Sequence, residues 1–487
     1  MILRLAVRSL ATRPLRSAVL AAGFGLGIAV MAALLGVGEV ILEQARSPAL
    51  AGGGDLVLSG ANGPVGSARF LLAHVIGADA FRRRTAAASP SRRAGLYLIV
   101  KPGDVVPVSV RGAIPSLQKA VGDSEVSRQE NWTDDPADAS WTRPSTEEIL
   151  RSMDRFHPVP RHAAHSSWAE WLYFNGRTSD GRLRFYLTFL VGGGSSTGTR
   201  PALVRLQLDR GGRSTNYSAT ALIDERTLLE RAPDLDVAGN QVRLDGSRYR
   251  IRLALLKETG GAAVIKPARA TPRTASLVGN ITLEAMPGRS LPPGEIHGAR
   301  GWVSGYVVPV LSGTVQGQLT VDGEHIDLDG AAGYHDHNWG FWDGVHWQWG
   351  QVADGDLSIV WGRVFPPADV ADPERIPGVL AVMGRDGPIA FSTNVAIVES
   401  GGGATPSDVT VRATGSAVDL TLAFTVAEHV RTRLSFTEML SVATPMDFLQ
   451  LGGTYRVTGR AAGREIAFTA RGSAETFRPD GEERKDR

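Results

Sequence analysis

Residues 333–350 concentrate side chains that could do chemistry. The stretch reads GYHDHNWGFWDGVHWQWG and contains four of the ten tryptophans and three of the ten histidines of the chain. If it is extended, successive side chains point to opposite faces, so that Tyr334 and Asp336 share one face while His335 and His337 share the other. The stretch therefore offers a carboxyl on one side and a pair of imidazoles on the other.

The position of Asp336 is predicted from the alternation before it and from the turn after it. Asp336 has the same parity as three preceding apolar residues, which indicates that it points inward unless a bulge intervenes at Gly330 or Gly333; these residues are Ile326, Leu328 and Ala332. Asp-Gly at 343–344 is typical of a two-residue hairpin turn, which would place Asn338 opposite Trp349. Trp347 and Trp349 would then share the inner face with Asp336.

A carboxylic acid walled by indoles can keep its proton near neutral pH, because burial penalises the charged form and raises the pKa. A protonated Asp336 could protonate an alkene, and indole faces would stabilise the resulting carbocation through cation–π attraction. Capture of the cation by water or by an internal alkene would give hydration or cyclisation. The alternative is structural: Asp336 and Asn338 close a buried hydrogen-bond network while the aromatic residues fill a core.

The imidazole face permits another alternative. His335-x-His337 on a strand is a metal-ligand spacing, and His346 would supply a third ligand of a zinc-type site in a metal-dependent hydrolase. Short histidine pairs of this kind are common in proteins without a metal. We therefore expect neither a metal nor any other cofactor.

A second aromatic cluster begins at Trp168 and contains Glu170, Trp171 and Tyr173. Aromatic residues at the start of a strand either fill the core or line a ligand site. Glu170 is unusual in this cluster, because a carboxylate beside two tryptophans needs a partner or a raised pKa.

The elements that must position both clusters are predicted to be strands. From 168 to 474, short alternating runs recur about every 10 to 15 residues, separated by Gly, Asp-Gly and Asn-Gly, which is typical of barrels and sandwiches. Asp-Gly at 245–246 and at 322–323 predicts hairpin turns. We expect a mainly β chain with two consecutive antiparallel barrels, over 166–300 and 301–475, followed by a charged tail over 476–487.

The N-terminal part predicts a membrane anchor. Residues 17–38 contain no charged side chain, and this length suffices for a helix to cross a bilayer. Arginines precede the run and glutamates follow it, which favours a cytoplasmic segment at 1–16 and a periplasmic body at a bacterial inner membrane. The alternative is a signal peptide cleaved near 49–51. Residues 39–165 are expected to form a linker or small adaptor, in which Ser145 and Glu148 are typical of a capping box.

Composition narrows the classes of function. The net charge is +2, from 52 basic and 50 acidic residues, so no overall field would recruit nucleic acid. The chain has no cysteine, which excludes disulfides, thiolate nucleophiles and zinc sites with cysteine ligands. An apolar fraction of 43% over 487 residues is typical of chains with buried cores.

The two clusters resemble signatures of a known superfamily. EWLYFNG with RFYLTFLV, and GYHDHNWG with WQWG about 160 residues later, are similar to the motifs of carotenoid 1,2-hydratases (hydroxyneurosporene synthase-like proteins) over 165–475. The resemblance implies two lipocalin-like domains, an apolar pocket, and acid-catalysed addition of water to an isoprenoid alkene without a cofactor. It also implies that Tyr334 and Asp336 form the Tyr-x-Asp pair involved in proton donation.

Two departures from the superfamily pattern argue against carotenoid hydration itself. The hydratases also use a His-x-Trp pair one strand earlier, and residues 301–313 contain none. Leu172 stands where relatives often have another tryptophan.

The N-terminal part resembles the opening of ABC permeases of the lipoprotein-release and macrolide-export class. The resemblance rests on LRLAVRSLATRPLRSAVLAAGFGLGIAV followed by GDLVLSGANGP, and it supports an anchor rather than transport.

Together these features predict a membrane-tethered protein whose barrels bind an apolar isoprenoid or lipid. As an enzyme it would be a hydratase or cyclase with Asp336 as the acid and Tyr334 orienting it. The alternative is a non-catalytic lipid carrier or accessory protein of an ABC exporter, with an ABC permease as partner. The residues expected to contact the ligand are Glu170, Trp171, Tyr173, His335, His337, Asn338, Trp339, Trp342, Trp347 and Trp349.

Overall fold

The chain forms two compact units, and its strands lie mainly in the larger one. The computed structural model describes residues 85–101, 104–123, 126, 131–142, 144–160, 167–193, 198–258, 274–401, 405–415, 417–434 and 446–479, with scattered residues before 85. The smaller unit comprises 1–64 and 87–134, and the larger unit comprises 65–86 and 135–487. The predicted linker or adaptor region, 39–165, is therefore divided between the two.

The smaller unit contains a hairpin of β1 (Ser91–Lys101) and β2 (Asp104–Ala113), followed by α6 (Pro115–Ala120). Proline occupies the first turn of this helix, where its missing N–H removes no helical hydrogen bond. Arg111 on β2 forms a 2.6 Å ion pair with the buried Asp123, which ties the end of the hairpin to the residues after the helix.

The larger unit begins with the short helical segments α8 (Pro136–Thr142), α9 (Thr146–Glu148) and η2 (Ile149–Met153). The predicted cap at Ser145 is confirmed, because its Oγ accepts a hydrogen bond from the Glu148 amide at 3.1 Å. Three buried side chains of η2, Ile149, Leu150 and Met153, bring this segment onto the first barrel.

The first sheet contains twelve antiparallel strands, and eight of them close into a barrel. The ring runs β10, β12, β14, β3, β4, β5, β6, β9 and back to β10. The ring closes through a short pairing, in which Tyr217 and Ser218 of β6 lie opposite Lys257 and Leu256 of β9. The strands are β3 (Trp168–Arg177), β4 (Leu183–Gly192), β5 (Thr199–Arg210), β6 (Arg213–Asp224), β7 (Leu235–Val237), β8 (Asn240–Asp245), β9 (Arg248–Lys257), β10 (Leu277–Ala285), β11 (Leu291–His297), β12 (Val303–Val321), β13 (Glu324–Asp327) and β14 (Ala331–Phe341), with α10 (Glu225–Arg231) and η3 (Ala299–Gly301) between strands.

Both predicted hairpins are present in this sheet, and one of them has the predicted turn. Residues 322–323 join β12 to β13 as predicted, whereas Gly246 and Ser247 join β8 to β9, because Asp245 already pairs with Arg248. In the turn at 322–323, Asp322 and Gly323 both have positive φ, 48° and 89°, as a type I′ turn requires.

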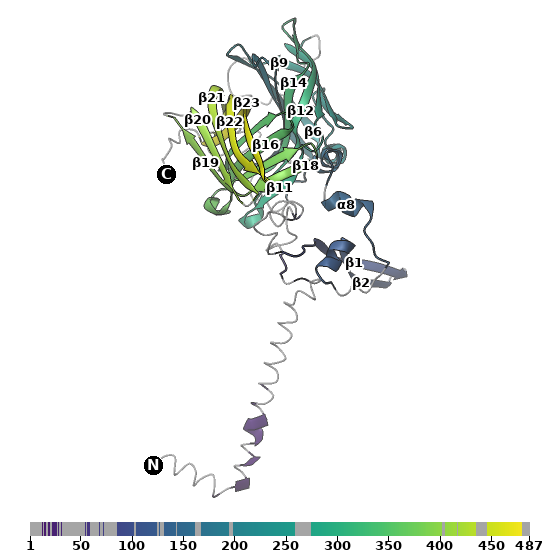
Figure 1. Cartoon of the computed structure of the whole chain (residues 1–487). Helices are drawn as coiled ribbons and strands as arrows, with labels where there is room; N and C mark the ends of the chain where they lie inside the picture. Colours follow the sequence, from purple (N-terminus) through teal and green to yellow (C-terminus); the bar gives the residue numbers. More distant parts are fainter. Residues whose placement is uncertain are drawn as a thin grey trace. The chain divides into compact units, whose positions relative to one another are not determined.

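The second sheet is a nine-stranded antiparallel, barrel-like sheet in the order β18, β17, β16, β15, β23, β22, β21, β20, β19. Figure 1 shows it beside the first sheet in green and yellow. Its strands are β15 (His346–Asp354), β16 (Leu357–Phe365), β17 (Val379–Gly384), β18 (Gly387–Ser392), β19 (Asn394–Ser400), β20 (Asp408–Thr414), β21 (Val418–Leu434), β22 (Met446–Ala461) and β23 (Arg464–Pro479), with η4 (Pro373–Arg375) after β16.

The division between the two sheets differs from the predicted barrel boundary at 300/301. β12 and β14 pair with β10 and β3, so the first sheet extends to Phe341 and the second begins at His346. The predicted hairpin at 343–344 is wrong for the same reason: β14 pairs with β12 and β3, whereas β15 pairs with β16 and β23. The turn thus passes the chain from one sheet to the other. β23 also continues to Pro479, beyond the predicted start of the tail at 476.

Each sheet has its own apolar core, and a third cluster joins them. The first core includes Phe174, Phe189 and Tyr249, and the second includes Trp361 and Tyr455. The joining cluster brings buried tyrosines of the first sheet against buried apolar residues of the second, and contains Tyr173, Tyr186, Tyr334, Trp349, Val360 and Met383. The outer face of the first barrel is therefore buried where it meets the second sheet.

The predicted anchor at 17–38 lies mostly outside the described residues, of which scattered positions between Thr12 and Met31 are helical. Within the part of the chain that the structure describes, no helix combines the length and apolar character needed to span a membrane.

We predict that Gly362→Ala disturbs the contact between the sheets. A Cβ at this position on β16 would lie 2.1 Å from Trp349 Cε3 and 3.0 Å from the Gln348 carbonyl oxygen, so the indole must move. The expected loss is about 1–3 kcal/mol in the free energy of unfolding, as for other overpacked cores. Urea denaturation followed by tryptophan fluorescence measures it. The control is Gly415→Ala, where the nearest atoms lie 3.9 and 4.0 Å away; equal stabilities of both variants would contradict the prediction.

Candidate functional site

A pocket lies where the two sheets meet, with about 1210 Å³ of empty space, part of it open to solvent. One wall comes from β3, β4, β5, β12 and β14, and the other from β15, β16, β21, β22 and β23. Most of the lining side chains are aromatic or aliphatic, and the others are polar or charged. The pocket is lined by Trp171, Tyr173, Tyr186, Thr188, Leu190, Leu203, Arg205, Gln207, Ser304, Gly305, Tyr306, Asp336, Asn338, Trp342, Trp347, Trp349, Val364, Thr432, Phe448, Gln450, Glu475 and Phe477.

The register of the first sheet arranges its wall in rows, because directly paired residues project from the same face. Across β14, β3, β4 and β5, one row contains Asp336, Tyr173, Thr188 and Arg205. The neighbouring row, two residues along, contains Asn338, Trp171, Leu190 and Leu203. A polar row thus runs beside a mainly apolar one.

The second sheet has the same arrangement across β15, β23 and β22. One row contains Trp349, Glu475 and Gln450, and the next contains Trp347, Phe477 and Phe448. Trp347 stacks on Phe477 with ring centroids 3.9 Å apart. The pocket therefore has an aromatic region and a polar region that contains two carboxyl groups, Asp336 and Glu475.

Asp336 is held by hydrogen bonds to both of its oxygens. Tyr334 donates its hydroxyl to Oδ2 at 2.7 Å, and Asn338 donates Nδ2 to Oδ1 at 2.7 Å. Trp349 on the second sheet donates its Nε1 to the Tyr334 hydroxyl oxygen at 2.9 Å. Burial raises the pKa of Asp336 to about 6, although the bond from Tyr334 and the nearby His335 and His337 act in the opposite direction.

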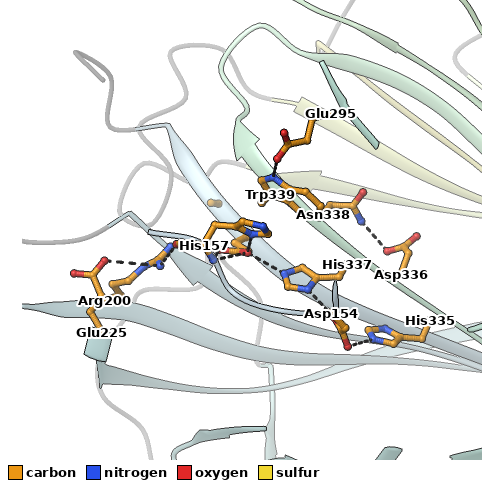
Figure 2. A network of polar contacts seen from close by, with 12 residues as sticks. Asp154, His157, Arg200, Glu225, Glu295, His335, Asp336, His337, Asn338 and Trp339 are labelled. Carbon is orange, nitrogen blue, oxygen red and sulfur yellow. Dashed lines mark hydrogen bonds and ion pairs between the residues drawn. The ribbon is translucent and has the colours of Figure 1, made fainter. Parts of the chain in front are cut away.

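The opposite face of β14 carries a separate buried network inside the first barrel. His337 bonds to Asp154 through Nδ1 at 2.6 Å and to Glu170 through Nε2 at 3.0 Å (Figure 2). Asp154 also meets His335 Nε2 at 3.1 Å and accepts the Tyr249 hydroxyl at 2.6 Å. All these side chains lie in the interior, where an unpaired charge would be costly.

The charges of this network depend on its hydrogen bonds. Burial opposes the charged imidazole, but bonds to Asp154 and Glu170 outweigh it and raise the pKa of His337 to about 9. Burial would also raise the pKa of Asp154 and of Glu170, yet their histidine partners hold both pKa values below the ordinary range. His337 is therefore an imidazolium between two carboxylates, and it fastens the segment before the barrel to β3 and β14.

The predicted alternation is confirmed along β14, but the predicted inner face requires correction. Ala331 packs in the first core, whereas Ala332, which was expected to share the buried face of Asp336, is exposed. The turn before β14, with Gly330 at φ 78°, resets the alternation. As a result His335 and His337 point into the first barrel, and Asp336 points out of it toward the second sheet.

The metal alternative is not supported by this geometry. Both ring nitrogens of His335 and His337 are engaged, with Asp154, Glu170 and the Tyr173 carbonyl oxygen. His346 begins β15 in the other sheet. Among the described residues, no three histidine, aspartate or glutamate side chains are placed to share a metal ion.

The predicted ligand contacts separate into two groups. The structure places Trp171, Tyr173, Asp336, Asn338, Trp342, Trp347 and Trp349 in the pocket lining. Tyr334 reaches this group through its bond to Asp336. Glu170, His335, His337 and Trp339 lie elsewhere, in the buried network and around it, where Trp339 stacks on His157 with ring centroids 4.2 Å apart.

Sequence reasoning missed several residues of both networks. Asp154 and His157 lie in a segment interpreted as a linker. The burial of Asp154 and the 2.7 Å contact of His157 with Glu170 show their role. Glu475, Gln450, Phe448 and Phe477 come from the last two strands, far along the chain from Asp336. Glu475 lies two residues before Phe477 in an alternating strand. This pattern is only a weak signal of a functional site, because exposed positions of strands often carry glutamate.

Comparisons with known proteins show weak similarity only. No family model matches the chain, and none of the curated proteins does. Among solved structures, a protein assigned as AttH from Nitrosomonas europaea is 17% identical, with 66% of this chain and 99% of that chain covered, at a TM-score of 0.40. CghA with Sch210972 is 12% identical, covering 69% and 98%, at 0.39. Kievitone hydratase from Nectria haematococca is 11% identical, covering 67% and 93%, at 0.40. Scores at this level carry no argument about function.

We predict that His337→Gln destabilises the first barrel, because it removes the cation that two buried carboxylates share. The expected loss is about 3–5 kcal/mol in the free energy of unfolding at pH 6. The pKa of His337 is higher in the folded chain, about 9, than in the unfolded chain, about 6.5. Its contribution is therefore complete below about pH 6.5 and is lost as the pH rises through about 9.

Urea denaturation at pH 6 and at pH 9.5 checks both parts of this prediction. The native protein should lose stability between the two pH values, and His337→Gln should lack that loss. His429→Gln, at an exposed position on β21, is the control and should behave as the native protein does. The same pH dependence in His337→Gln and the native protein would contradict the assignment.

Proposed function

We propose that the protein binds an apolar isoprenoid-like or lipid-like ligand in the pocket between its sheets, and that Asp336 transfers a proton there in a cofactor-independent hydration or cyclisation. The observation that carries this proposal is a buried carboxyl with a raised pKa in a pocket walled by aromatic rings. A group whose pKa lies near the working pH is suited to move a proton in either direction.

The aromatic region suits the cation that protonation of an alkene would create. Trp171 packs against Trp342 with ring centroids 4.4 Å apart, and Trp342 meets Trp347 edge to face at 5.4 Å. Indole faces attract a carbocation through their quadrupole. Because apolar side chains dominate the lining, the pocket also favours a ligand with a hydrocarbon chain.

The resemblance to the carotenoid 1,2-hydratase superfamily agrees with this reading of the site. Its Tyr-x-Asp pair corresponds to Tyr334 and Asp336, which share a 2.7 Å hydrogen bond. Leu172, which stands where relatives often have a tryptophan, packs in the first core and is not among the lining residues of the pocket. In the place of a His-x-Trp pair, β12 brings Ser304 and Tyr306 to the pocket. The two barrel-like sheets would correspond to tandem lipocalin-like domains, and the different lining favours a substrate other than a carotenoid.

The test of this function is organic extraction and mass spectrometry of lipids that co-purify with the protein, compared between native protein and Asp336→Asn. Native protein should release a hydrated or cyclised isoprenoid, whereas Asp336→Asn should hold the unmodified lipid. Turnover should fall about 10²- to 10⁴-fold, the usual contribution of acid–base catalysis.

Asp209→Asn is the control, because Asp209 on β5 also has a pKa raised by burial but lies outside the pocket lining. It should resemble the native protein. The same unmodified lipid from native protein and Asp336→Asn would favour a non-catalytic carrier. Absence of any apolar ligand from both would contradict the pocket proposal.

We also propose that residues 17–38 anchor the protein in a bacterial inner membrane with its body in the periplasm, so that the ligand reaches the pocket from the lipid phase. The uncharged run and the arginines before it support this orientation. Deletion of residues 1–46 should move the protein from the membrane fraction to the soluble fraction of a bacterial lysate. Recovery of the full-length chain in the soluble fraction would contradict the anchor.

A further inference from the structure

Two buried carboxyl groups face the same ligand space from different sheets. Asp336 lines the pocket from β14, and Glu475 lines it from β23. Glu475 is 8% exposed, and its partners in the register are Trp349 on β15 and Gln450 on β22. Buried carboxyl groups are rare unless they are paired with a cation, so a pair of them in one pocket needs an explanation.

Polar neighbours of Asp336 oppose the effect of burial, which raises the pKa of its carboxyl to about 6. Hydrogen bonds from Tyr334 and Asn338 reach both of its oxygens, and donors to a carboxyl stabilise its charged form. On the opposite face of β14, His335 and His337 act on Asp336 in the same direction. Asp336 is thus prepared to accept a proton.

The surroundings of Glu475 favour the neutral acid. The groups that face it are Tyr173 on β3, Tyr186 on β4, and Tyr334 and Asp336 on β14. A hydrogen bond from Tyr173 acts in the opposite direction on the Glu475 carboxyl, and Tyr173 itself accepts a bond from Gln450 Nε2 at 3.1 Å. Arg205, the cation in the pocket lining, is instead paired with Glu258 at 3.2 Å. Burial, and then repulsion from Asp336, raise the pKa of Glu475 to about 8.

From this geometry we propose that Glu475 is the catalytic acid that protonates the ligand and that Asp336 is the base that receives a proton from the attacking water. The assignment rests on the function proposed above and divides the proton transfers between the two sheets. Asp336, which accepts hydrogen bonds at both oxygens, takes the role of the base, and Glu475, which is buried facing tyrosines and a second carboxyl, takes the role of the acid. The assignment requires the second sheet for catalysis.

In the proposed hydration, the O–H bond of Glu475 breaks and the alkene electron pair of the ligand forms a new C–H bond with the released proton. This step leaves a carbocation on the adjacent carbon and a carboxylate on Glu475. The water oxygen forms a bond to that carbon, and the proton of the water passes to Asp336. The product is an alcohol that has gained one water, and proton exchange with solvent returns Glu475 to the acid and Asp336 to the carboxylate.

The protonation state can be tested without a ligand by infrared spectroscopy of the full-length protein across pH. At neutral pH, the stretching band of a buried protonated carboxyl should be present in the native protein and in Asp336→Asn, and should be missing from Glu475→Gln. The band should vanish as the pH rises above about 8. Its retention in Glu475→Gln would overturn the proposal. Glu399→Gln is the matched control, because Glu399 is a half-buried carboxyl of the same sheet that pairs with Arg478 and lies outside the pocket lining.

The catalytic role is tested with geranylgeraniol as the probe and with water labelled with heavy oxygen. Glu475→Gln and Asp336→Asn should each lower label incorporation by about 10²- to 10⁴-fold, while Glu399→Gln should keep the native rate. The native rate should have limbs near pH 6 and pH 8, and Glu475→Gln should lack the alkaline limb. Full activity of Glu475→Gln with loss in Asp336→Asn would overturn the role of Glu475 and leave the proposed function standing. Full activity of both variants would overturn the proposed function as well.

Discussion

The first barrel depends on a buried charge network centred on the imidazolium of His337, between the carboxylates of Asp154 and Glu170. Such carboxylates need partners at this depth, because an uncompensated buried charge costs several kcal/mol, and Arg200 adds a second buried cation 3.9 Å from Glu170. His337, Glu170 and Asp154 come from β14, from β3 and from the segment before β3. This network therefore sets which face of β14 points into the barrel and closes the barrel against its preceding segment.

Because side chains alternate along β14, the face that points into the first barrel also decides which residues of this strand line the pocket. With His335 and His337 inside the first barrel, Tyr334, Asp336 and Asn338 must face the second sheet. The positive charge behind the strand also favours the carboxylate of Asp336, while Glu475 on the other wall has only neutral or acidic neighbours among the groups that act on it. Burial raises both pKa values, that of Asp336 to about 6 and that of Glu475 to about 8, so between these pH values the first is mainly a carboxylate and the second mainly an acid, as in acid–base pairs of enzymes.

Much of this architecture follows from local patterns in the sequence. The Asp-Gly turn at 322–323, the cap at Ser145 and the opposite faces of Asp336 and His337 are consequences of backbone geometry within a few residues. Asp336 and the tryptophans of residues 333–350 can be recognised as a candidate site from the sequence, because indoles next to a carboxyl are unusual. The turn at 343–344 was assigned to a hairpin because a two-residue Asp-Gly turn fits one, although here it leads from one sheet into the other.

The sequence by itself determined the strand character of the chain, the alternation along β14 and the identity of the Tyr334 and Asp336 pair. These depend on bond geometry and on side-chain types that neighbouring residues can reveal. Only the tertiary structure decided which face of β14 is inside the barrel, that Asp154 neutralises His337, and that Glu475 lies in the same pocket as Asp336. Such pairings are formed between strands far apart along the chain, where packing and the cost of burying charge select the partner, and no local pattern encodes that selection.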